Sequence, residues 1–164
     1  VVPFVMSKEE LTLGEVNSML NKHSGLLAIS GSSGDMREII EAMEEGDRNA
    51  KLAFDMFCYR LRKYVGAYAA AMNGLDAIVF TAGIGENSPH VRKAVCEGLS
   101  FLGVKLDEAA NFNAAKEARF ISAPDSRVKV LVVPTNEELI IARDTYRLVT
   151  ERKRAGETAA ALES

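Results

Sequence analysis

Three short segments combine small, flexible residues with polar groups suited to a phosphorylated ligand. Residues 30–37 read Ser-Gly-Ser-Ser-Gly-Asp-Met-Arg and end in the charged residues Asp35 and Arg37. Residues 81–88, Thr-Ala-Gly-Ile-Gly-Glu-Asn-Ser, and residues 134–138, Pro-Thr-Asn-Glu-Glu, each follow an apolar run. Glycine lets a backbone approach a ligand closely, and the start of a helix offers free N–H groups to an anion. The three segments are therefore candidates for a nucleotide site.

Each segment also has a purely structural interpretation. Residues 30–37 suit a flexible linker that ends in a helix cap, and residues 81–88 suit a strand-to-helix turn. The glycine spacing matches neither the dinucleotide fingerprint nor a Walker loop. Thr135 and Glu138 fit a capping box. Glu137 is then a carboxylate that could hold Mg²⁺ directly or through water, or a surface glutamate favoured by the helix dipole.

Two apolar runs rich in β-branched residues, 75–80 and 128–133, predict strands of a parallel sheet. Strands covered on both faces have such near-continuous apolar sequences. Each run leads through a polar loop into a helix, beginning near Ser88 and near Thr135. Ligands of parallel sheets bind at the carboxyl ends of the strands, which is where two of the three segments lie.

Capping residues predict the remaining helices. Thr12 and Glu15 form the pattern of a capping box, and Asp35 and Asp47 suit N-caps of later helices. The helix that Asp47 would cap runs over residues 48–73 and has apolar side chains over a broad arc. So broad an apolar surface predicts burial on more than one side.

The predicted order of helices and strands is that of an α/β chain. Two strands alone make a poor sheet, because their exposed edges invite aggregation. Further strands either lie outside these residues, which we favour, or come from the short apolar runs near Phe4, Leu27 and Phe120.

Composition narrows the class of protein. The 164 residues, 48% of them hydrophobic, suit one domain. The net charge of -3 lacks the excess of basic residues that is typical of a nucleic-acid-binding domain. No apolar run approaches the ~18 residues that span a bilayer, and the apolar start lacks the basic leader of a secretion signal. Cys58 and Cys96 make neither a disulfide framework nor a metal spacing. We therefore expect a cytoplasmic protein with neither nucleic acid nor membrane as a partner.

In this order, the segments resemble those of the acetate kinase family. Residues 80–88 resemble its nucleotide-binding Gly-Ile-Gly-Glu-Asn segment, and residues 133–139 resemble its Pro-Thr-Asn-Glu-Glu-Leu segment. Residues 32–37 lie where the family has a serine-rich loop followed by Asp, an apolar residue and Arg, and residues 59–68 also fit. The resemblance covers roughly residues 1–149.

The resemblance implies the C-terminal portion of an actin-like, ribonuclease H-like ATPase domain, with an incomplete mixed sheet and covering helices. The nucleotide-binding portion is expected over residues 1–150, with residues 151–164 as a frayed helix or a disordered tail. The family's N-terminal half has no counterpart in these residues. That half carries the first phosphate loop, the carboxylate pocket, the His-x-Gly-Asn-Gly type loop and the Arg, His and Asp nearest the transferred phosphoryl group.

The resemblance also implies the reaction: reversible, Mg²⁺- or Mn²⁺-dependent phosphoryl transfer from ATP to acetate, giving acetyl phosphate and ADP, in a homodimer. Glu137 would help to place the metal. Met36 departs from the aromatic residue often found at its position. With no catalytic residue of its own, this chain is expected to have negligible activity alone. The nucleotide would contact Asp35, Met36, Arg37, Gly83, Ile84, Gly85, Glu86 and Asn87.

Two alternatives stay open. A propionate or butyrate kinase fits equally, because the carboxylate pocket belongs to the other half of the family's chain. A non-catalytic nucleotide-binding or assembly module also fits, with the apolar surface of the helix over residues 48–73 serving a partner.

Overall fold

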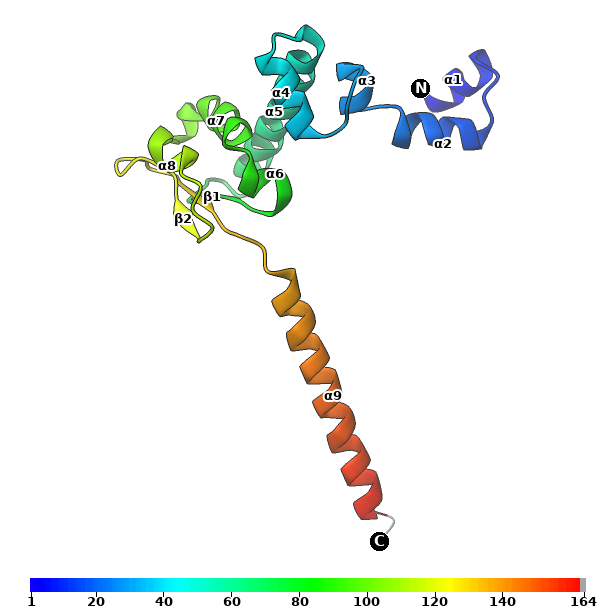
Figure 1. Ribbon diagram of the computed structural model, residues 1–164, viewed down its shortest axis with the longest axis vertical. Coiled ribbons are helices and arrows are strands. Elements are labelled where there is room, and N and C mark those ends of the chain that lie inside the picture. The colour runs from blue at the N-terminus through cyan, green and yellow to red at the C-terminus, as the bar shows by residue number, and fades with distance from the viewer. Residues whose placement is uncertain (163–164) are drawn as a thin grey trace. The chain divides into compact units, whose positions relative to one another are not determined.

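The computed structural model describes the backbone of residues 1–162 and the side chains of residues 1–151 (Figure 1). The chain divides into two compact units, Val1–Val133 and Pro134–Ser164. Among the described residues, no helix is both long and apolar enough to cross a membrane.

The first unit holds most of the secondary structure, and the second unit contains α9 (Glu137–Leu162). The elements of the first unit are α1 (Val2–Lys8), α2 (Leu13–Lys22), α3 (Leu26–Ser30), α4 (Met36–Glu44), α5 (Arg48–Ala71), β1 (Ala77–Phe80), α6 (Ala82–Asn87), α7 (Pro89–Glu97), the 3-10 helix η1 (Ser100–Leu102), α8 (Glu108–Phe112), β2 (Arg119–Phe120) and β3 (Lys129–Val132).

The tail was expected to be a frayed helix or disordered from residue 151 onwards. The structure continues α9 through Leu162, and residues 163–164 lie outside the described residues.

The sheet has three strands in the order β1-β3-β2. β1 and β3 are parallel, with Ala77 opposite Lys129, which confirms the predicted pairing. β2 runs antiparallel to β3, so the sheet is mixed, as expected. Of the three short apolar runs proposed as extra strands, only the one at Phe120 forms a strand, because the runs at Phe4 and Leu27 lie in α1 and α3.

One face of the sheet packs against α5 and α7. Ile78, Val130 and Val132 point into this core, where they meet buried side chains of both helices. Val79, on the opposite face of β1, is 53% exposed. The prediction that both faces are covered is therefore wrong within the first unit, which supplies helices to one face only.

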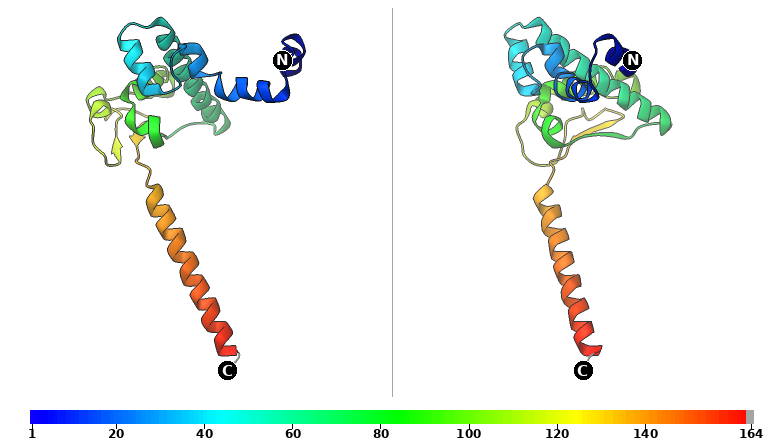
Figure 2. Two further views of the ribbon diagram at one scale, coloured as in Figure 1. Left: turned by 45° about the vertical axis from the view of Figure 1, so that its right-hand side comes forward. Right: turned by 90° about the vertical axis from the view of Figure 1, so that its right-hand side faces the viewer.

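The helix α5 is the central helix of the first unit, because α3, α4 and α7 all pack against it. Figures 1 and 2 show α3 and α4 alongside it. Cys58 of α5 and Cys96 of α7 lie in the core, where burial raises the pKa of their thiols to about 11 and about 12. Both thiols are thus protonated packing groups near neutral pH.

Burial of α5 on more than one side, predicted from its broad apolar arc, is wrong within this unit. Ala50, Ala53 and Phe54 are buried, whereas Tyr59 is 57% exposed and Tyr68 63% exposed. The physical reason is that α3, α4, α7 and the sheet all meet the same side of the helix. The other side of α5 exposes apolar and aromatic side chains, Tyr59 and Tyr68 among them, beside the charged Lys51 and Asp55.

The predicted caps of α2 and α5 are confirmed. Thr12 and Glu15 form a reciprocal capping box, and the Thr12 N–H, followed by its hydroxyl, lowers the pKa of Glu15. Asp47 accepts hydrogen bonds from the first amides of α5. The helix after Ser88 is shorter than predicted, because α7 ends at Glu97, with Gly98 as its C-cap, instead of continuing to Gly103.

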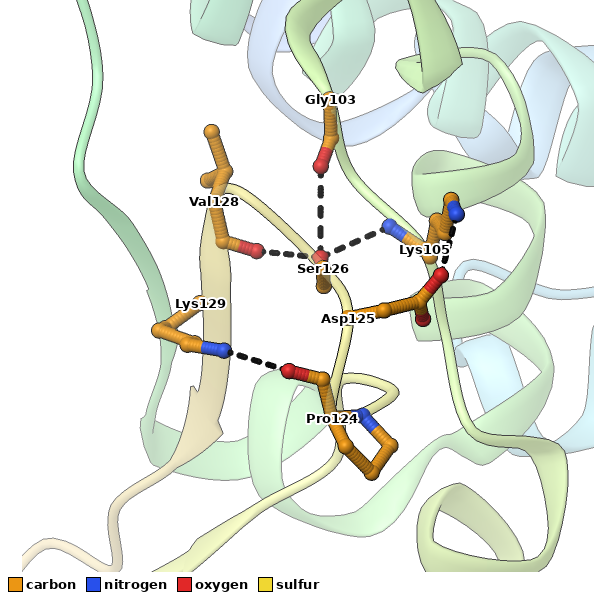
Figure 3. Close-up of polar contacts among 7 residues, drawn as sticks. All are labelled: Gly103, Lys105, Pro124, Asp125, Ser126, Val128 and Lys129. Atoms are coloured by element: carbon orange, nitrogen blue, oxygen red, sulfur yellow. Dashed lines mark hydrogen bonds and ion pairs between the residues drawn. The ribbon is translucent and has the colours of Figure 1, made fainter.

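Ser126, a buried residue in the turn before β3, connects this turn to the segment after η1 through hydrogen bonds (Figure 3). The Ser126 hydroxyl accepts a hydrogen bond from the Lys105 N–H at 2.9 Å and donates one to the Val128 carbonyl at 2.6 Å. Lys105 also forms an ion pair with Asp125. These contacts set the position at which β3 begins.

We predict that Ser126→Ala lowers the free energy of unfolding by about 1–3 kcal/mol, because it leaves the Lys105 N–H without its acceptor. Urea unfolding followed by circular dichroism measures the change. Ser122→Ala is the matched control, since no hydrogen bond of the Ser122 hydroxyl is found among the described residues. Equal stability of the two variants would contradict the assigned role of Ser126.

Candidate functional site

An open cleft of about 650 Å³ lies where the start of α4 faces α6 and the start of α7. Two stretches far apart in the sequence, 34–41 and 83–90, form its walls. Six of the eight residues expected at the nucleotide line it, and Gly85 and Glu86 do not. The lining residues are Gly34, Asp35, Met36, Arg37, Ile40, Glu41, Gly83, Ile84, Asn87, Ser88, Pro89 and His90.

The serine-rich segment before α4 is an internally hydrogen-bonded turn rather than an open linker. Ser30 is buried, and its hydroxyl donates to the Ser33 carbonyl at 2.7 Å while accepting from the backbone of Ser32 and Ser33. The Ser33 hydroxyl then accepts from the Asp35 N–H at 2.9 Å. This turn delivers Asp35 to the cleft in a defined position.

Asp35 and Arg37 form a bidentate ion pair at the rim of the cleft. Arg37 Nη2 lies 2.6 Å from Asp35 Oδ2, and Nε lies 3.1 Å from Oδ1. Asp35 is also the N-cap of α4, as predicted, because Oδ1 accepts from the Arg37 N–H at 2.8 Å. The hydrogen bonds from the Arg37 side chain, then from its backbone, lower the pKa of Asp35 to about 2.

The Arg37 side chain is 86% exposed, so its guanidinium is open to an incoming anion. Met36, in contrast, is 3% exposed and belongs to the core. It contributes to the floor of the cleft.

The glycine-rich segment is a short helix, α6, instead of the predicted loop. The Glu86 carboxylate accepts a hydrogen bond from the Ala82 N–H at 2.7 Å, and the Asn87 side chain donates to the Gly83 carbonyl at 2.9 Å. These contacts close the segment on itself. With its carboxylate held at the start of α6, Glu86 is not part of the cleft lining.

The two glycines of α6 have different surroundings. A Cβ on Gly85 would lie 3.4 Å from the Phe80 carbonyl carbon, so glycine permits close packing against the end of β1. A Cβ on Gly83 would meet nothing within 4 Å, and Gly83 lines the cleft. Of these two glycines, Gly83 is therefore the one that allows close approach to a ligand. Each glycine costs about 1 kcal/mol relative to alanine inside a helix, so α6 depends on outside support.

Sequence reasoning did not single out Arg92, a fully buried residue of α7 that contacts α6 from behind. Its Nη1 donates to the carbonyls of Gly85 at 2.9 Å and Glu86 at 2.7 Å. Its Nε and Nη2 donate to Asn111. Burial lowers the pKa of Arg92, with a smaller contribution from the charge of Arg119. One signal was present: Arg92 shares the helical stripe of Val95, Cys96 and Leu99, all buried.

His90, which lines the cleft and which sequence reasoning left aside, connects three helices. Its Nε2 lies 3.5 Å from Glu44 Oε1 at the end of α4. Its ring packs edge-on against Phe112 of α8, with 5.4 Å between ring centroids. His90 therefore closes one end of the cleft.

Glu137, the predicted metal residue, is exposed at the first position of α9. Asn136 contributes to the cap of α9, because its Oδ1 accepts from the Leu139 N–H at 2.9 Å. Glu137 belongs to the second unit and the cleft to the first. Within the described part of the chain, no three His, Cys, Asp or Glu side chains are grouped to hold a metal.

Comparisons with known proteins agree with one another. A family model described as the Acetokinase family matches residues 1–143. The acetate kinase of Symbiobacterium thermophilum is 60% identical over 152 residues, which are 93% of this chain and 38% of that protein. The crystal structure of Porphyromonas gingivalis acetate kinase has a TM-score of 0.82 at 45% identity, covering 90% of this chain and 37% of that one.

A propionate kinase from Francisella tularensis is also similar. It has a TM-score of 0.77 at 40% identity, covering 86% of this chain and 35% of that one. The chain thus spans less than two-fifths of the length of these relatives.

We predict that Arg37→Ala raises the pKa of Asp35 from about 2 towards its ordinary value of 3.8. The stabilisation from a carboxyl with a lowered pKa is complete above pH 3.8 and is lost as the pH falls through about 2. Carbon-detected NMR titration of the carboxyl group measures the shift. Arg48→Ala, which removes an exposed arginine from another helix, should leave it unchanged. A titration midpoint unaffected by Arg37→Ala would refute the ion pair.

Proposed function

Because the chain belongs to the acetokinase family, we propose that it supplies the adenosine side of an acetate kinase. That enzyme transfers a phosphoryl group reversibly between ATP and acetate, with Mg²⁺, giving acetyl phosphate and ADP. The observation that carries the proposal is that residues 35–37 line one cleft together with Gly83, Ile84 and Asn87, from positions almost fifty residues apart.

The predicted fold supports this proposal. An α/β chain with an incomplete mixed sheet was expected, and the structure confirms it. Its fold is that of part of the solved acetate kinases, and it is consistent with a partial actin-like ATPase domain.

The cleft offers a nucleoside both an apolar surface and polar anchors. Ile40 and Ile84 supply apolar area for a base, and Gly83 lets the ligand approach the backbone. The Arg37 guanidinium can stack on a base or exchange its carboxylate partner for a phosphate oxygen. Near neutral pH the Asp35 carboxylate can only accept hydrogen bonds, because its pKa is about 2. It could therefore accept a hydrogen bond from a ribose hydroxyl or from the amino group of a base.

Glu137 is proposed to help place Mg²⁺. Mg²⁺ binds few protein carboxylates and keeps several waters, and an exposed glutamate at a helix start is open to such a hydrated ion. When bound, the metal neutralises charge on the nucleotide phosphates. The groups nearest the transferred phosphoryl are proposed to lie outside these 164 residues, so the chain alone should have negligible turnover.

A propionate kinase is the second candidate, favoured by the similarity to the Francisella tularensis protein of that name. The cleft described above serves the nucleotide and does not distinguish the two carboxylates. The intact protein is further proposed to be a cytoplasmic homodimer, with the exposed face of α5 around Tyr59 and Tyr68 as a surface suited to a partner.

We predict that Gly83→Leu weakens ADP binding at least tenfold, because the added side chain would occupy the cleft. The fold should persist, since a Cβ at Gly83 meets no atom within 4 Å and leucine favours a helix. Isothermal titration calorimetry of the intact protein measures the affinity, and thermal unfolding checks the fold.

Gly66→Leu is the matched control for this experiment. Gly66 is also helical and also has open space at its Cβ position, but it lies on α5 away from the cleft lining. Wild-type ADP affinity in the Gly83 variant would show that the nucleotide binds elsewhere.

We predict that Glu137→Gln raises the Mg²⁺ concentration for half-maximal activity by about 10- to 100-fold, the usual effect of losing a supporting metal contact. The measurement is a Mg²⁺ titration of acetyl phosphate formation by the intact protein. Glu138→Gln is the control, because this neighbour is equally exposed at the start of α9. The same Mg²⁺ requirement in both variants and the wild type would exclude Glu137 from the metal site.

A further inference from the structure

The α6 wall of the cleft is a helix that its own sequence stabilises poorly. It has six residues, of which Gly83 and Gly85 are poor helix formers. The residue at its start, Ala82, has a backbone φ of 55°, a left-handed conformation that is costly for alanine. Isolated helices of this length do not form in water, so contacts from outside must hold α6 in place.

Arg92 provides the contacts at the C-terminal end of α6. The last carbonyls of a helix lack partners within the helix. The Ile84 carbonyl accepts from the Ser88 N–H at 3.0 Å, and the next two carbonyls, of Gly85 and Glu86, both accept from Arg92 Nη1. A cation at this end also interacts favourably with the helix dipole. Arg92 is thus a cap for α6 that comes from a different helix.

Asn111 of α8 fixes the guanidinium from the opposite side. Its Oδ1 accepts from Arg92 Nε at 2.7 Å, and its backbone carbonyl accepts from Nη2 at 2.7 Å. Its own Nδ2 donates to the Pro89 carbonyl at 2.9 Å. Arg92 is 1% exposed and Asn111 is 0% exposed, so neither group exchanges its partners for water. This geometry uses the planar fork of arginine, which the single ammonium group of lysine does not reproduce.

The Arg92 guanidinium contacts α6 outside the lining of the cleft. Gly83, Ile84 and Asn87 of α6 line the cleft, whereas Arg92 does not. Arg92 instead donates to the carbonyls of Gly85 and Glu86, two α6 residues that do not line the cleft. We propose that Arg92 is the positioning residue of this site: supported by Asn111, it keeps α6 in the conformation that receives the nucleotide.

The proposal rests on the proposed function only in naming the ligand as a nucleotide. A protein whose binding-competent conformation is partly lost binds more weakly in proportion to that loss. Loosening α6 should therefore weaken nucleotide binding without changing the acetate site. A role in general stability alone would lower the amount of folded protein and leave the affinity of the remainder unchanged.

The test compares Arg92→Lys and Asn111→Ala with the wild type in the intact protein. Hydrogen exchange of the amides of residues 86–88, which close α6, is expected to be about tenfold faster in both variants, while exchange in β3 is unchanged. The KM for ADP is expected to rise about tenfold, with the KM for acetyl phosphate within twofold of the wild type. If Arg92→Lys folds poorly, the Asn111→Ala variant still tests the proposal.

Arg127→Lys is the matched control, because Arg127 also donates to a backbone carbonyl, that of Leu102, and is remote from the cleft lining. Unchanged exchange at residues 86–88 in both variants would overturn the proposal, as would an unchanged KM for ADP with a reduced maximal rate. If the wild type binds no ADP, the proposed function fails, and the exchange data alone decide whether Arg92 positions α6.

Discussion

One buried guanidinium group ties together three helices of the first unit. Arg92 extends from α7 to the end of α6 on one side and to Asn111 of α8 on the other. A buried charge is costly unless its hydrogen-bonding capacity is met, and here four hydrogen bonds to oxygen atoms meet it. Without this group, α6 would retain only its local contacts, and one wall of the cleft would lose its support.

The sheet and α5 supply the frame on which this arrangement rests. Parallel pairing of β1 with β3 places the end of β1, and so the start of α6, beside the core formed with α5 and α7. The same α5 holds α4, whose first turn carries Asp35 and Arg37. Both walls of the cleft are therefore anchored to α5, one through α4 and the other through α7. This shared support explains how short segments fifty residues apart form one site.

The side chains that line the cleft are better suited to binding a ligand than to catalysing phosphoryl transfer. The charged side chains of the cleft are the Asp35–Arg37 ion pair and Glu41, and the rest of its lining is glycine, apolar and neutral polar residues with one imidazole. Phosphoryl transfer needs concentrated positive charge on the moving group. The chain spans less than two-fifths of the length of these relatives. Under the proposed function, the cleft binds the nucleotide, and the groups that act on the transferred phosphoryl lie outside these residues.

The sequence by itself determined the features that depend on neighbours along the chain. The capping box at Thr12, the cap at Asp35 and the strands around Ile78 and Val130 were all predicted, because caps and strand patterns are local. The glycine-rich motif also marked a segment that partly lines the cleft, although its conformation was predicted wrongly as a loop.

Only the tertiary structure decided which side chains meet across long separations. Arg92 and Asn111 are 19 positions apart, and no local pattern pairs a buried arginine with a buried asparagine. The helical form of α6 depends on that pair, and so does the placing of Gly83 in the cleft while Gly85 packs against β1. The exposure of Tyr59 and Tyr68 on α5 was likewise set by where other elements pack. Local hydrogen bonding can be read from residue order, whereas burial depends on partners that folding brings together.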